Sequence, residues 1–145
     1  MARKNVQLLG VDAVTETLKQ VSPREGKGIA RRTITKVAAS VRDDMRQRAP
    51  HDEGTLRKAI KSRRSRSHGS FIRAAIYITH GKRATRDAFY WHWLEFGSSD
   101  MRPKPFIQPT VEAWRGEVEA EWARQWWPQY EKEMAKRARK QAGLK

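Results

Sequence analysis

The sequence predicts an α+β fold: a small antiparallel β-sheet packed against a long N-terminal-half helix and a long C-terminal amphipathic helix. Three patterns carry this prediction. Residues 29–48 place an apolar stripe at helical spacing, through Ile29, Thr33/Ile34, Val37, Val41 and Met45. Residues 71–79 alternate with a period of two, which is typical of a strand. Helical spacing returns in Val111, Trp114, Val118, Trp122 and Trp126.

The first part of the chain predicts three elements before the long helix. Residues 5–10 indicate a short strand. Asp12 can cap a helix whose buried side holds Val14, Leu18 and Val21, and Ser22-Pro23 would end that helix. Residues 24–28 contain two glycines and are predicted to form a loop. The long helix over residues 29–48 follows.

Residues 48–60 form the sharpest change of pattern in the sequence. Pro50 disfavours helix in the residue before it, and Asp52 and Gly54 are typical turn residues. Asp52 can also cap a short helix with Leu56 and Ile60 on its buried side. The segment therefore predicts a corner that leads from the helical first third into the strands.

A β-hairpin is predicted next. His68-Gly69 is a turn signal between residues 61–67 and the strand over 71–79. The first of these segments carries the basic residues Lys61, Arg63, Arg64 and Arg66. They fit a charged edge that prevents mispairing, and the alternative is a basic segment that reaches toward phosphate.

Aromatic residues crowd residues 89–97, and the sequence favours a buried His92 bonded to Glu95 there. A proline-rich stretch, residues 105–109, then leads into the last helix. Pro128 is predicted to break or kink that helix. From about residue 136 the chain is a basic tail that we expect to be flexible. All 145 residues are assigned to one domain.

The charge of the chain is strongly positive: Lys+Arg is 31 against Asp+Glu 16, a formal net charge of +15. Such a chain is drawn to polyanions. The candidates to face DNA or an acidic partner are the hairpin cations Lys61, Arg63, Arg64 and Arg66 and the C-terminal cations Lys136, Arg137, Arg139 and Lys140. With 0 Cys we expect no disulfides. No apolar run reaches the roughly 20 residues of a membrane span, so we expect no membrane contact.

The sequence offers no convincing catalytic set, and we predict no catalytic, cofactor-binding or metal-binding residues and no enzymatic activity. There is no Cys nucleophile and no phosphate-binding loop. His51, Asp52 and Glu53 are neighbours in sequence and do not converge on one metal. An acid-dependent nuclease could pair His92 and Glu95 with Asp87 or Asp100, but it lacks the acidic cluster of two-metal chemistry.

Three motifs, in order, resemble the small tail-component (tail-completion, neck) proteins of long-tailed bacteriophages. The first is Ala49-Pro50, Asp52-Glu53-Gly54, Leu56-Arg57 and Ala59-Ile60; the second is Tyr90, Glu95-Phe96-Gly97 and Ser98; the third is Pro105-Phe106 and Pro109 before the tryptophan helix. Departures from the family pattern are Glu53 for Thr, Ala59 for Ser, Trp91 for a small residue and Ser98 for Thr.

The resemblance implies a non-enzymatic virion protein that assembles in the host cytoplasm. It would form a homo-oligomeric ring, six- or twelve-fold, at the head–tail junction or tail end, around the DNA channel. Its partners would be itself, the head-connector and tail-tube proteins and, nonspecifically, genomic DNA, with no cofactor. The structural hinges or subunit contacts would be Pro50, Asp52, Gly54, Leu56, Arg57, Glu95, Phe96, Gly97, Pro105, Phe106 and Pro109.

The alternative function is a nonspecific DNA-binding protein that acts free in the cytoplasm. The net charge supports it, and no helix-turn-helix, zinc-finger or RNA-binding signature points to sequence-specific recognition. Binding would then be directed at the phosphate backbone and would fall steeply with salt.

Overall fold

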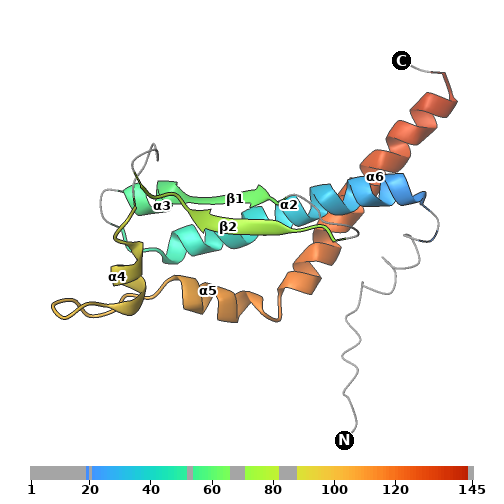
Figure 1. The fold of residues 1–145 in the computed structure, drawn as a ribbon. Helices are drawn as coiled ribbons and strands as arrows, with labels where there is room; N and C mark the ends of the chain where they lie inside the picture. The colour runs from blue at the N-terminus through green and yellow to red at the C-terminus, as the bar shows by residue number, and fades with distance from the viewer. Residues whose placement is uncertain (1–18, 20, 52–53, 66–70, 82–87, 144–145) are drawn as a thin grey trace, which may run out of the picture.

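A computed structural model describes residues 19, 21–51, 54–65, 71–81 and 88–143 of the chain. The predicted strand over residues 5–10 and most of the helix capped by Asp12 lie outside the described residues. The described elements follow in the order α2 (Pro23–Arg48), α3 (Thr55–Ala59), β1 (Ile60–Arg64), β2 (Ala74–Ile78), α4 (Trp91–Phe96), α5 (Ile107–Trp114) and α6 (Val118–Gln141) (Figure 1). The predicted α+β class is confirmed.

The long helix α2 is the element on which the others are arranged, and it begins earlier than predicted. Ser22 is its N-cap: the Ser22 hydroxyl accepts from the Glu25 amide at 3.4 Å, and the Glu25 carboxylate accepts from the Ser22 amide at 3.3 Å. This capping box, with Pro23 in the first turn, outweighs the two glycines. The predicted loop over residues 24–28 is therefore wrong, whereas the stripe through Ile29 and Met45 is buried as predicted.

The predicted antiparallel pairing of the hairpin strands is confirmed, and the turn predicted at His68-Gly69 lies outside the described residues. β1 and β2 pair antiparallel in the register Ile60↔Ile78 to Arg64↔Ala74, and both strands pack on α2. The short helix α3 precedes β1, as the corner predicts. The residue at its N-cap position is Gly54, which adopts φ 75° and supplies no side chain, and the cap predicted from Asp52 is not among the described contacts. Asp52 itself lies outside the described residues.

The predicted C-terminal helix is two helices. The chain turns at residues 115–117, between α5 and α6, a segment that contains Gly116, and the Trp114 indole Nε1 donates to Asp44 Oδ2 of α2 at 2.9 Å. Consequently the apolar stripe does not form one buried face, and Val111 and Val118 are exposed.

The predicted break at Pro128 is also wrong, since α6 runs through Pro128 to Gln141. Pro128 is exposed, so the backbone carbonyl it leaves without a helical donor can face water. The basic segment from residue 136 is helical as far as Gln141.

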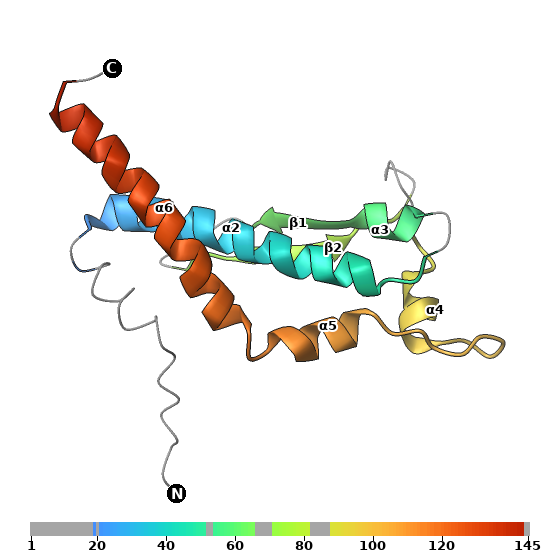
Figure 2. The same ribbon diagram turned by 180° about the vertical axis from the view of Figure 1, so that it is seen from behind.

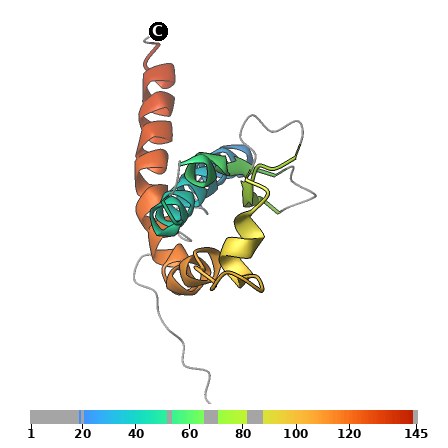
Figure 3. The same cartoon turned by 90° about the vertical axis from the view of Figure 1, so that its left-hand side faces the viewer.

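Apolar side chains gather in two clusters, one toward each end of α2. The first lies under the hairpin and α3 and contains Met45, Ala49, Leu56, Ala59, Ile60, Ala88 and Phe106. The second lies where α6 crosses α2 (Figure 2) and contains Val21, Ile29 and Trp126. Trp122 stacks on Trp126 with 5.1 Å between the ring centroids. Seen end on, the hairpin, α5 and α6 surround α2 on different sides (Figure 3).

Glu121 joins α6 to α2 between the two clusters. Its carboxylate accepts from Ser40 Oγ at 2.9 Å, Gln125 Nε2 at 2.9 Å and Arg124 Nε at 3.0 Å. Burial raises the pKa of Glu121, but the hydrogen bonds from Gln125, Ser40 and Arg124 outweigh burial and hold the pKa below its ordinary 4.5. The ionised carboxylate is thus favoured in the folded state.

This pKa shift predicts a pH dependence for Glu121→Gln. Because the folded pKa lies below the unfolded value, the carboxylate stabilises the fold above pH 4.5, and that contribution is lost as pH falls through the folded pKa. We expect the loss of unfolding free energy caused by Glu121→Gln to be largest near neutral pH and to shrink below pH 4.5. Urea unfolding across this range measures it. Glu119→Gln, at an exposed position in the same turn, is the control; a loss that does not vary with pH would contradict the prediction.

Candidate interaction surfaces

The first motif builds a rigid corner at the end of α2. Arg57, from α3, donates to the Ala49 carbonyl oxygen from Nε at 3.2 Å and from Nη2 at 3.1 Å. A cationic side chain on the last carbonyls of a helix satisfies acceptors that have no helical donor. Ala49 is extended, with ψ 134°, as Pro50 predicts. Arg57 and Pro50 therefore fix the angle at which the chain leaves α2.

In the second motif, Glu95 caps a helix eleven residues further along the chain. Glu95 Oε2 accepts from the Phe106 amide at 2.8 Å and the Ile107 amide at 2.9 Å, and Oε1 accepts from the Gln108 amide at 2.8 Å. These amides open α5, where a negative charge is favourable. The predicted buried His92 bonded to Glu95 is wrong. His92 is exposed, and the buried Glu95 carboxylate accepts hydrogen bonds from backbone amides instead.

The loop after α4 returns the chain to α5 through a tight turn. Gly97 adopts φ 79°, the Ser98 amide donates to the Met101 carbonyl at 3.0 Å, and the Lys104 amide donates to the Leu94 carbonyl at 2.7 Å. Of the third motif, Pro105 is exposed and Pro109 is half-buried, whereas Phe106 is fully buried in the first apolar cluster. Phe106 therefore anchors the start of α5.

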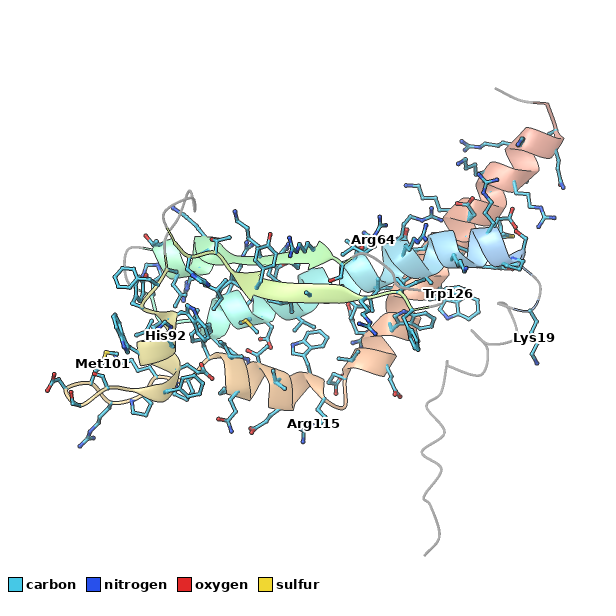
Figure 4. The ribbon with its side chains drawn as sticks, in the orientation of Figure 1. Lys19, Arg64, His92, Met101, Arg115 and Trp126 are labelled. Atoms are coloured by element: carbon cyan, nitrogen blue, oxygen red, sulfur yellow. The ribbon has the colours of Figure 1, made fainter. Side chains whose placement is uncertain are left out.

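These motifs, far apart in the sequence, meet at one end of the molecule. A hollow of about 500 Å³ lies between the α2–α3 corner and α4; we call it the corner hollow. Its lining comprises Pro50, His51, Gly54, Leu56, Tyr90, Trp93, Leu94, Met101 and Lys104. Figure 4 shows His92 and Met101 at this end and Trp126 at the distant α2–α6 crossing.

Beside the corner hollow, three aromatic side chains are exposed: Phe89 (53%), Trp93 (46%) and Phe96 (76%). We call them the aromatic surface. The rings of Phe89 and Trp93 meet edge to face with centroids 5.7 Å apart. Apolar exposure concentrated in this way is typical of an interaction site rather than of scattered surface residues. The predicted contact residue Phe96 is thus placed where a partner can reach it.

A basic groove lies at the opposite end, where α6 diverges from the N-terminal half of α2. It consists of two hollows, of about 560 and 440 Å³, that share Glu133 and Lys136. Its cations are Arg24, Arg32, Lys132, Lys136, Arg137, Arg139 and Lys140. The C-terminal candidates therefore stand beside cations of α2, a pairing that the sequence alone does not show.

The basic hairpin residues lie apart from the linings of these hollows. Arg63 and Arg64 are exposed on β1, and the Arg63 guanidinium lies 5.0 Å from the centre of the Tyr77 ring. Lys61 is half-buried. Arg66 lies outside the described residues.

Within the described part of the chain, no group of three or more His, Cys, Asp or Glu side chains could hold a metal ion. The nuclease alternative is weakened by the geometry of Glu95, whose oxygens accept three backbone amides. Asp100 is exposed, and Asp87 lies outside the described residues. No helix among the described residues is long and apolar enough to cross a membrane.

Comparison with protein families matches residues 12–97, more than half of the chain, to a model described as "Bacteriophage HK97-gp10, putative tail-component". The chain belongs to the HK97-gp10-like family. The match includes the α2–α3 corner and the Glu95–Gly97 turn, and it ends before the third motif and α6. No curated protein and no solved structure matches the chain significantly.

Membership of the HK97-gp10-like family identifies the chain as a structural component of a tailed bacteriophage. The chain acts in the virion with other structural proteins of the particle. A structural family of this kind favours a non-enzymatic role.

Proposed function

We propose that this tail component is a subunit of a homo-oligomeric ring at the head–tail junction or tail end, where it encloses the DNA channel and joins neighbouring connector and tail-tube proteins. The chain would act as one domain. The observation that carries the proposal is the convergence of two family motifs on the corner hollow, beside the aromatic surface. Aromatic residues are enriched in protein–protein interfaces.

The separation of two surfaces also supports a ring. The aromatic surface is formed at α4, and the basic groove is lined by α6 and α2. Figure 1 shows α4 and the C-terminal part of α6 at opposite ends of the ribbon. A ring subunit needs apolar contacts with other proteins and separate cationic contacts with the genome it encloses. Contacts with phosphate alone let DNA slide, because they carry no sequence information.

Electron microscopy of particles from a phage that lacks this gene tests the proposal. We expect filled heads beside unattached or over-long tails, and restoration of joined particles when the intact gene is supplied in trans. Joined, infectious particles without the gene would overturn the ring proposal. They would favour instead a nonspecific DNA-binding protein free in the cytoplasm, which the net charge of +15 also supports.

A further inference from the structure

We propose that the basic groove between α2 and α6 binds the phosphate backbone of duplex DNA. The inference rests on the proposed function for the presence of DNA beside the subunit, and it assigns the contact to two helices that are distant in sequence. It places the main phosphate contact in this groove and not on the basic strand β1.

The charges in the groove are mostly free of internal partners. Arg32 bonds Glu133 at 2.8 Å, and Arg137 lies 3.9 Å from Glu25. Lys132, Lys136 and Arg139 have no carboxylate within salt-bridge distance among the described residues. Unpaired cations held beside one another repel, and a polyanion relieves that repulsion.

The composition of the groove favours a nucleic acid over an acidic protein. Besides charged residues, its lining contains only Gly28 and Ala135. Protein–protein interfaces have an apolar centre and are depleted in lysine, whereas DNA interfaces are more polar and much more positive. The aromatic surface of Phe89, Trp93 and Phe96 lies at the α4 end instead, and the exposed Phe71, which precedes β2, lines neither hollow.

The same composition favours a duplex over a single strand. Binding of single strands relies on aromatic side chains on which the bases stack. No aromatic residue lines either hollow of the groove among the described residues. Cations without stacking rings suit the regular phosphates of a duplex, which are bound independently of sequence.

A matched pair of triple variants tests the assignment in the full chain. The groove variant carries Lys132→Gln, Lys136→Gln and Arg139→Gln; the control carries Lys58→Gln, Arg102→Gln and Arg115→Gln. All six positions are exposed, and each triple removes the same charge. Gln has nearly the helix propensity of Lys and Arg, and circular dichroism would verify that both variants remain folded.

Affinity for a short duplex of arbitrary sequence is measured from about 0.05 to 0.2 M salt. We expect the groove variant to bind at least about tenfold more weakly and to reduce the slope of log affinity against log salt by about 2 to 3, whereas the control changes affinity less than about threefold. Equal weakening by both triples, or none by the groove triple, would overturn the assignment.

A third measurement separates this inference from the proposed function. The groove variant is supplied in trans to phage that lacks the gene, and incorporation into particles is scored. Normal duplex affinity with lost incorporation would indicate an acidic protein partner and would overturn the DNA assignment. A different pair of results is that the purified groove variant binds duplex weakly while the phage joins heads and tails without this gene. That pair would support the DNA assignment of the groove and overturn the ring proposal.

Discussion

Replacement of Glu95 by alanine is expected to lower the free energy of unfolding by about 3 to 4 kcal/mol, because hydrogen bonds to a buried charge are strong and their donors would be left without a partner. The carboxylate accepts three backbone amides of α5, from Phe106 to Gln108, at 2.8–2.9 Å. Glu95 is 6% exposed and Phe106 is fully buried, so water cannot simply replace the carboxylate. Urea denaturation followed by tryptophan fluorescence measures the loss.

Two further substitutions make the Glu95 experiment specific. Glu95→Gln retains one acceptor oxygen but presents an amide N–H toward the α5 amides, so we expect a loss of about 2 kcal/mol. Glu119→Ala removes an exposed carboxylate from α6 and is expected to change stability by less than about 0.5 kcal/mol. A loss below about 1 kcal/mol for Glu95→Ala would show that the cap does not hold α5 in place.

Elements whose signal is local in the sequence could be predicted. The stripe of α2 and the two-residue alternation of β2 depend only on neighbouring residues, and the structure confirms the helix and the strand that they predict. The start of α2 differs from the prediction, because the capping box in Ser22-Pro23-Arg24-Glu25 favours helix more strongly than Gly26 and Gly28 oppose it. Residues 24–28 show that a complete cap can outweigh two glycines.

Features that depend on contacts distant in sequence could not be predicted. Glu95 caps α5 through backbone amides. Because every residue except proline has a backbone amide, the residue types do not indicate which amides a carboxylate binds. Trp114, the last residue of α5, bonds Asp44, which lies 70 residues away in the sequence. The basic groove likewise exists only because α6 crosses α2, which brings Lys136 near Arg32. The sequence indicates the C-terminal cations as candidates, but it does not indicate which residues lie beside them.

Gly97→Ala is expected to destabilise the protein by about 2 to 4 kcal/mol through backbone strain and a steric clash together. Gly97 has φ 79° and ψ 177°, a region that is essentially restricted to glycine. An added Cβ would lie 3.0 Å from the Met101 carbonyl oxygen and 3.0 Å from Pro103 Cδ. Neither atom is at the end of a flexible side chain, so the loop itself would have to move.

Gly116→Ala is the matched control, because it alters another glycine in a turn where an added Cβ meets no atom within 4 Å. We expect it to be neutral or to stabilise the protein by up to about 1 kcal/mol, since alanine restricts the unfolded chain. Urea unfolding compares the two variants. Because Met101 and Lys104 line the corner hollow, movement of the loop at Gly97 would also reshape that hollow. Equal effects of the two substitutions would mean that Gly97 is tolerant of a side chain and that the loop is not held by this turn.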